Sequence, residues 1–219
     1  MMSYRNMFVL TFICGLFLFA ALSGQSASDL QHHKIARISG ADSISFCICL
    51  PESYSDGDLE YPIVYHLHGM DGYYGGWQSQ WMADFFREEA RNKEVPEVIL
   101  VFPDGKDGFW GNHYDGDPML ESDLFDELIP YMDRTFRTDK QKRMIMGWSA
   151  GAPGALFFFT KHPDIFKGVV SLDGALLSWE EMHYFQPERT DQITNSDSLY
   201  FYEYFSPYRW IEKNSKALA

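Results

Sequence analysis

The segment Lys142–Phe159 has the sequence KRMIMGWSAGAPGALFFF, and the rest of the predicted fold is arranged around it. Within it, Gly147–Gly151 matches the pattern G-x-S-x-G, in which a serine lies on a sharp turn between a strand and a helix. The apolar run Met144–Met146 precedes the turn and the helix-compatible run Ala155–Phe159 follows it. Such a match also occurs by chance in glycine-containing loops, but a strand before it and a helix after it favour a nucleophile elbow. The sequence therefore predicts Ser149 as a catalytic nucleophile.

Acyl transfer by a serine also needs amide groups that stabilise the oxyanion formed during attack. The N–H of Ala150, directly after the serine, is the first candidate donor. We assign the second to Met70, because Gly69 permits the turn that points this amide inward. For His66 and His68, on and just after the strand that leads to this loop, we expect structural roles, with His68 shaping the loop by hydrogen bonding.

Apolar runs and helical spacing outline the remaining elements. We expect an antiparallel pair within Ser28–Leu50, buried strands at Pro62–Leu67, Val98–Phe102 and Phe166–Leu172, and helices at Trp81–Arg91 and Glu121–Phe136. In the first of these helices, Trp81, Phe85 and Ala90 are expected on the inner face. Ser178–Asp197 is polar and irregular, typical of a lid or linker, and the aromatic-rich Tyr200–Ile211 is interrupted at Pro207.

Strands and helices alternate at least three times, which predicts an α/β protein with a mostly parallel sheet and helices on both faces. Ligands bind such sheets at the carboxyl ends of the strands. The loops at Gly69, Asp104, Ser149 and Asp173 all follow predicted strands, so we expect them along one edge.

Length and composition limit the possible functions. The chain has 219 residues, enough for one domain with a sizeable core, and 17% of them are aromatic. Its formal charge of −13 argues against nucleic acid or an anionic membrane surface as a partner. We find no cluster of ligands at metal spacing, so neither a metal nor a cofactor is expected.

The N-terminal segment has the features of a secretory signal peptide. Arg5 precedes the apolar run 7–22, and small residues follow it. We expect a signal peptide at residues 1–27, cleaved near 23–27, and a mature domain at 28–219 that is secreted or periplasmic and has no stable membrane association. An uncleaved helical anchor is the alternative.

The mature segment holds two cysteines, Cys47 and Cys49, which face the same side of a predicted strand and are poorly placed to bridge each other. We interpret them as small buried hydrophobic residues.

Four blocks of sequence resemble the putative esterase family of α/β-hydrolases. They are YPIVYHLHGMDG (61–72), VILVFPDG (98–105), ESDLFDELIPYMDRTFRT (121–138) and MIMGWSAGAPGAL (144–156). That family includes feruloyl and acetyl xylan esterases, S-formylglutathione hydrolases, enterochelin esterases and mycolyltransferases. The resemblance covers about 43–177 and implies an α/β-hydrolase fold, a Ser-Asp-His triad and an oxyanion hole. It also implies that Lys106–Pro118 borders the substrate cleft, with Trp110, His113 and, beside the serine, Trp148 as cleft residues.

One departure from the family bears on activity. In that family the triad acid and histidine follow the nucleophile on two further strands, whereas no segment of strand length follows Asn214 here. We therefore expect an α/β-hydrolase that lacks its last strands and helix, with an unpaired apolar sheet edge open to another chain. Three explanations compete: a fragment of an active enzyme, a natural short form that retains the cleft for binding, or Asp173 and His183 in place of the missing pair.

The sequence thus predicts a serine carboxylic ester hydrolase, weak or inactive as this chain. By resemblance its substrate is a small-molecule or polysaccharide ester, such as the feruloyl or acetyl esters of xylan. The alternative is a non-catalytic carbohydrate-binding or interaction protein on an esterase scaffold.

Overall fold

The computed structural model describes residues 30–38, 42–70, 72–106 and 109–218. The signal peptide predicted at 1–27 lies outside the described residues, as does most of the turn that the sequence SGAD (39–42) predicts between the first two strands. Among the described residues, no helix combines the length and the apolar character needed to cross a membrane.

In the described part of the chain, six strands form one sheet in the order β1-β2-β4-β3-β5-β6. Their bounds are β1 Gln31–Ala36, β2 Ser43–Cys49, β3 Tyr61–Leu67, β4 Ile99–Pro103, β5 Thr138–Trp148 and β6 Gly168–Leu172. The strands β4, β3, β5 and β6 are parallel, and β1 and β2 add an antiparallel extension next to β4. This arrangement confirms the predicted α/β class and its mostly parallel sheet.

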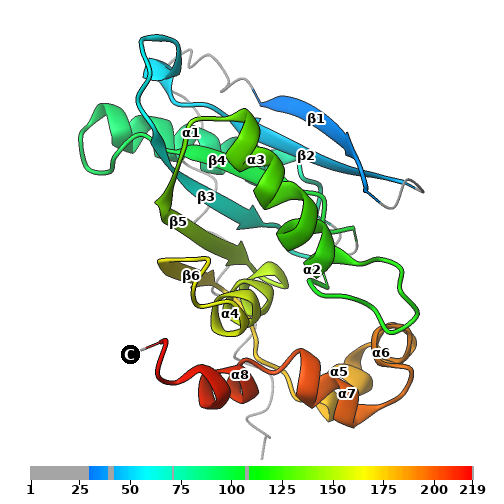
Figure 1. Ribbon diagram of the computed structural model, residues 1–219. Helices are drawn as coiled ribbons and strands as arrows, with labels where there is room; N and C mark the ends of the chain where they lie inside the picture. Colours follow the sequence, from blue (N-terminus) through cyan, green and yellow to red (C-terminus); the bar gives the residue numbers. More distant parts are fainter. Residues whose placement is uncertain (1–29, 39–41, 71, 107–108, 219) are drawn as a thin grey trace, which may run out of the picture.

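Helices cover both faces of this sheet (Figure 1). Helix α1 (Trp77–Arg91) lies on one face, and α3 (Ile129–Thr135) and α4 (Gly151–Lys161) lie on the other. A short helix, α2 (Leu120–Ser122), and a π-helical stretch, Asp123–Leu128, lead into α3 without a break. The predicted helix at Glu121–Phe136 is therefore confirmed as one continuous helical segment.

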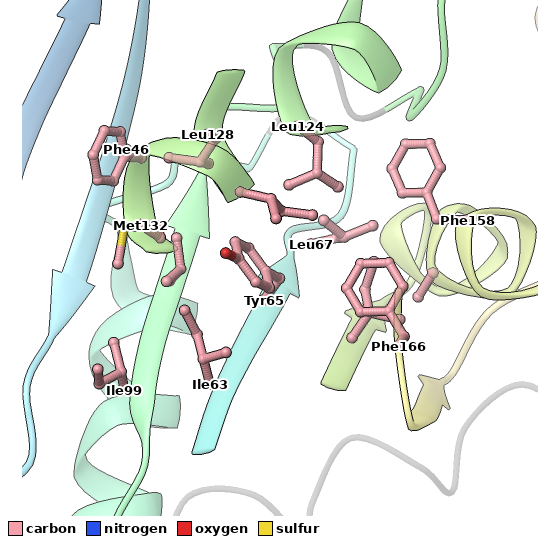
Figure 2. Close-up of a cluster of buried hydrophobic side chains, with 14 of the residues drawn as sticks. Phe46, Ile63, Tyr65, Leu67, Ile99, Leu124, Leu128, Met132, Phe158 and Phe166 are labelled. Atoms are coloured by element: carbon pink, nitrogen blue, oxygen red, sulfur yellow. The ribbon is translucent and has the colours of Figure 1, made fainter. Parts of the chain in front are cut away.

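The main core lies between the sheet and α3 and α4 (Figure 2). Tyr65 of β3 is fully buried there, among Leu128, Met132, Phe158 and Phe166. A second cluster on the other face joins α1 to β2, β4 and β5. Alternation along each strand assigns its residues to one cluster or the other, because successive side chains point to opposite faces of the sheet.

The predicted inner face of α1 is wrong for Trp81 and Phe85, whereas Ala90 is half-buried and lines a cavity with Ala83 and Leu100. Met82 and Ala83 are 2% and 1% exposed and face the sheet, whereas Trp81 and Phe85 are 48% and 44% exposed. Residues four apart form a stripe on either side of a helix, so the i, i+4 spacing of the two aromatic residues was compatible with both orientations.

The C-terminal region is helical, so the predicted irregular segment at Ser178–Asp197 is also wrong. It contains α5 (Trp179–Phe185) and α6 (Pro187–Thr194), followed by α7 (Ser198–Tyr204) and α8 (Pro207–Asn214). The predicted interruption at Pro207 is confirmed, since this residue starts α8. We call α5–α7 the cap; it lies below α2 and α4 in Figure 1.

Cys47 and Cys49 are both buried and unbridged, as the sequence predicts.

Candidate functional site

The turn between β5 and α4, Gly147–Gly151, is a tight elbow made of backbone packed on backbone. Ser149 has a φ of 53°, a left-handed conformation that costs a residue other than glycine about 1–2 kcal/mol. A Cβ atom on Gly151 would lie 2.2 Å from the Leu67 carbonyl oxygen, and one on Gly147 would lie 2.0 Å from that of Gly151. The amide of Ser149 donates to the Leu172 carbonyl at the end of β6 (2.9 Å). These contacts fix the turn and leave Ser149 exposed.

The loop after β3 lies directly against the serine. A Cβ atom on Gly69 would be 3.1 Å from that of Ser149. The Gly69 carbonyl accepts hydrogen bonds from His68 Nδ1 (2.8 Å) and from the Gly72 amide (3.0 Å). Because a trans peptide is planar, holding this carbonyl also fixes the direction of the Met70 N–H, which points the opposite way.

His68 and Trp110 connect the loops after β3 and β4. His68 Nε2 accepts the Gly105 amide (2.9 Å), so the proton is on Nδ1 and both ring nitrogens are engaged in the structure. Trp110 Nε1 donates to the His68 carbonyl (3.0 Å), and Gly105 and Gly154 leave the space that its ring fills. His68 therefore has the predicted loop-shaping role.

His66 is 1% exposed within the sheet, so its role is structural, as expected. Burial, and to a lesser extent the neighbouring His68, lowers the pKa of His66 to about 4, which keeps the ring neutral near pH 7.

A pocket of about 260 Å³ opens over the serine. Its walls come from the elbow, the β3 and β4 loops, α4 and the cap, and its lining is mostly apolar. The lining residues are Met70, Phe109, Trp110, Ser149, Ala150, Pro153, Gly154, Phe157, Asp173, Ala175, Leu177, Met182, Phe185, Gln186, Ile193, Phe201 and Phe205. Asp173 is the one charged residue in this described lining.

Side chains tether the cap over the pocket, and the Tyr114 amide also donates to the Ile193 carbonyl of α6 (3.0 Å). Gln186 Nε2 lies 3.2 Å from Met70 Sδ. The Gln186 amide oxygen also accepts from Arg189 Nη1 (3.3 Å), and the Arg189 guanidinium lies 4.8 Å above the Phe109 ring. These contacts join α6 and the residue before it to the loops after β3 and β4.

The structure brings together some of the predicted site residues and separates others. Ser149, Ala150, Met70 and Trp110 all line the pocket, whereas Trp148 and His113 do not. Trp148 precedes the serine on β5 and packs against Trp81 of α1 (5.7 Å between ring centroids). His113 is 6% exposed and buried in its own loop, where its amide donates to the Pro118 carbonyl.

The two candidate substitutes for the triad partners are also separated. Asp173 follows β6 with a φ of 53° and lines the pocket. His183 stacks on Trp179 of α5 (4.7 Å), and its Nε2 lies 3.3 Å from Asp191 of α6, outside the pocket. None of the histidines in the described ranges lines the pocket.

The cap contributes pocket residues that sequence reasoning missed, among them Met182, Phe185, Ile193, Phe201 and Phe205. The signals for these helices were local: Ser178 and Glu181 form a capping box at the start of α5, and Pro187 occupies the first turn of α6.

Solved structures of esterases share this fold. One ferulic acid esterase is 25% identical over 67% of this chain and 58% of its own, with a TM-score of 0.59. A substrate-bound fluorophosphonate-binding serine hydrolase F of Staphylococcus aureus is 16% identical over 87% of this chain and 75% of its own, with a TM-score of 0.70. An S-formylglutathione hydrolase from Agrobacterium tumefaciens is 17% identical over 88% and 74%, with a TM-score of 0.66.

This chain thus spans little more than half the length of the ferulic acid esterase that it matches. A comparison with curated proteins finds no match. The family model described as "Putative esterase" matches residues 40–200, most of the chain and all of the elbow. The chain therefore belongs to this esterase family of α/β-hydrolase fold.

Proposed function

We propose that this chain is a serine esterase whose nucleophile is Ser149. The observation that carries the proposal is the left-handed turn that holds Ser149 exposed at the pocket, against the Gly69 backbone. The Ser149 hydroxyl oxygen attacks the ester carbonyl carbon and loses its proton to a base, and the carbonyl oxygen becomes an oxyanion. Collapse of this intermediate expels the alcohol, and water then hydrolyses the acyl-enzyme.

We assign oxyanion stabilisation to the N–H groups of Met70 and Ala150. Two hydrogen bonds to the Gly69 carbonyl fix the Met70 amide before any substrate arrives. Ala150 directly precedes α4, and the first amides of a helix have no partner within the helix. Donors fixed in advance stabilise developing charge without reorganising, and losing one costs about 10²- to 10³-fold in rate.

Attack by Ser149 also needs a base that accepts its proton. None of the described histidines lines the pocket, and its one charged residue is Asp173. A serine without its base retains only about 10³- to 10⁴-fold rate enhancement over water, from the oxyanion hole and binding. We therefore expect weak hydrolysis by this chain, and the same observation favours a second candidate, a binding protein that uses the esterase pocket without chemistry.

The proposed substrate is a carboxylic ester whose acyl or alcohol part is uncharged and apolar, because five phenylalanines and two methionines line the pocket. One structural neighbour is a ferulic acid esterase in complex with ferulic acid, and by likeness we extend the proposal to acylated plant polysaccharide, such as feruloyl or acetyl xylan esters. Such a substrate agrees with the secreted or periplasmic location that the N-terminal sequence predicts.

A fluorophosphonate probe tests the nucleophile. We expect the purified chain to be labelled at Ser149, as read by peptide mass spectrometry, and labelling to be lost in Ser149→Ala. A matched control is Ser171→Ala, which removes an exposed serine hydroxyl from β6 outside the pocket lining. If the folded chain stays unlabelled but binds methyl ferulate in titration calorimetry, the binding function replaces the esterase.

A further inference from the structure

A second cavity, of about 230 Å³, lies on the α1 face of the sheet and shares no residue with the pocket over Ser149. It is bounded by the C-terminal half of α1, the end of β2 and the start of β4. Because β4 is parallel to β3 and β5, its start lies at the opposite edge of the sheet from the elbow. In the strand order, β3 and β5 separate β4 from β6, so the cavity lies well away from β6.

The inner wall of this cavity is apolar. It contains Ala83 and Leu100, which are 1% and 2% exposed, together with the half-buried Phe86 and Ala90. Ligand pockets commonly combine such an apolar lining with a few polar groups that fix the orientation of the ligand. Drug-sized ligands occupy about 300–1,000 Å³, so a smaller ligand, with a single ring or a short carbon chain, fits here.

Arg87 of α1 is a mostly buried cation that lines the cavity and makes only long contacts. Its side chain is 19% exposed. Nη2 donates to Cys49 Sγ (3.6 Å), and Nε lies 3.7 Å from Glu52 Oε1. A thiol is a weak acceptor, and 3.7 Å is too long for a hydrogen bond between nitrogen and oxygen. A guanidinium has five N–H donors, so most of those of Arg87 are available to a ligand.

Two carboxylates also line the cavity, but each is held by other donors. Both oxygens of Glu52 accept from Arg91, through Nε (3.1 Å) and through Nη2. Glu97 accepts from the Ser53 amide (3.1 Å) and from the Ser53 hydroxyl. Within the described residues, Arg87 therefore shares the carboxylate of Glu52 with Arg91 and has none of its own.

We propose that this cavity binds a small monocarboxylate, whose carboxylate group pairs with Arg87 and whose ring or short chain packs against Phe86 and Ala90. The planar guanidinium matches a carboxylate and can donate two parallel hydrogen bonds to it. Inorganic anions such as phosphate fit less well, because their polar oxygens would lie against the apolar wall without partners. The proposal does not depend on Ser149 or on the esterase function.

Titration calorimetry of the full chain with sodium benzoate tests this site. We expect binding with a Kd of about 1 mM or lower, and Arg87→Gln should weaken it at least about tenfold. The matched control is Arg209→Gln, which removes the same charge from an exposed ion pair and should leave the affinity unchanged. Benzamide has the same ring without the charge, so it should bind at least about tenfold more weakly than benzoate.

Ala90→Leu tests the cavity without changing its charge, and it also covers the case in which Arg87→Gln fails to fold. The larger side chain fills the space beside Phe86, so benzoate binding should be lost while the circular dichroism spectrum is unchanged. No binding of benzoate to the native chain overturns the proposal. Native affinity in a folded Arg87→Gln or Ala90→Leu variant also overturns it, because benzoate would then bind elsewhere, such as at the pocket over Ser149.

Discussion

The elbow and the cap form two walls of the same pocket, and they are held in place by different kinds of contact. At the elbow, the absent side chains of Gly147 and Gly151 let backbone approach backbone, and there is no room for even one added carbon. In the cap, α5 buries no residue and α7 buries only Phe201. Its contacts with the loops after β3 and β4 come from long side chains such as Gln186 and Arg189, with one backbone hydrogen bond, from the Tyr114 amide to the Ile193 carbonyl (3.0 Å).

This difference indicates how the site tolerates change. Backbone contacts with no free space cannot adjust, so the elbow should respond to substitution in an all-or-none way. Side-chain contacts at an exposed surface can be replaced or lost at low cost, so the cap is free to vary in sequence and to open locally. The rigid wall carries the proposed nucleophile, and the adaptable wall lines the rest of the pocket.

The largest expected effect is at the elbow. Gly151→Ala places a Cβ atom 2.2 Å from the Leu67 carbonyl oxygen, and neither backbone segment can move without disturbing β3 or α4. We expect a loss of at least about 3 kcal/mol in the free energy of unfolding, measured by urea denaturation. That loss is a large part of the about 5–15 kcal/mol of a typical domain.

The control in the same turn is Ser149→Ala, which keeps the Cβ atom and removes only an exposed hydroxyl. It should change the stability by less than about 1 kcal/mol. Equal losses in the two variants would show that the turn is generally fragile rather than filled with backbone atoms.

The second largest effect on stability is expected at a buried ionic cluster that connects α2 to the end of α4. Glu121 of α2 pairs with Lys161 Nζ (2.8 Å) and His162 Nε2 (2.7 Å) at the end of α4. Lys161 also lies over the rings of Tyr204 and Trp210, which bring in α7 and α8. Although burial alone would raise the pKa of Glu121, the hydrogen bond from His162 and the charge of Lys161 hold this pKa below its usual value.

The sign of the pH dependence follows from this lowered pKa. A carboxyl whose folded pKa lies below its unfolded value of about 4.3 stabilises the fold above that pH, and this contribution disappears as the pH falls through the folded pKa. We expect Glu121→Gln to cost about 1–3 kcal/mol in urea unfolding at pH 7, and the difference from the native chain to shrink below about pH 4. Glu203→Gln, which breaks an ion pair with Arg209 that is about half exposed, should cost at most about 0.5 kcal/mol and serves as the control.

The contrast between the two walls also explains what could be predicted from the sequence. Five residues, with a strand before and a helix after, specify the elbow locally, and the rule that strands end at one edge placed Gly69, Asp104 and Asp173 near it. The cap was missed because its helices have only 7 or 8 residues each and bury few side chains, so they have no strong apolar periodicity.

The position of Trp148 shows a second limit. It is adjacent to Ser149 in sequence, which suggested a place in the cleft. In the sheet, however, it follows Met146 on the α1 face, because alternate residues of β5 point to the same side. The strand register would have revealed this, but the five-residue motif by itself contains no information about which face each neighbour takes.

Replacing Ser149 by glycine should relieve backbone strain at the elbow, which is a smaller effect and one that stabilises the fold. Ser149→Gly removes the side chain from a residue with a φ of 53°, a conformation that glycine adopts without cost. We expect the free energy of unfolding, measured in urea, to rise by up to about 1 kcal/mol. The added glycine also makes the unfolded chain more flexible, which offsets part of this gain. Fluorophosphonate labelling should be abolished. A variant no more stable than Ser149→Ala would mean that the elbow stores no strain at the serine.

The smallest effect is expected in the cap, where Gln186→Ala removes the contacts of this side chain with Met70 Sδ and with Arg189. Global stability should change by less than about 0.5 kcal/mol, because one contact is exposed and the other is only partly buried. Amide hydrogen exchange should instead report local opening, faster in α5 and α6 and unchanged in β3, whose residues are almost all buried. Gln80→Ala removes a side-chain hydrogen bond to Asp84 within α1 and should leave exchange in the cap unchanged. Equally faster hydrogen exchange in the cap and in β3 would contradict the distinction between a rigid and an adaptable wall, because the two walls would then open as one cooperative unit.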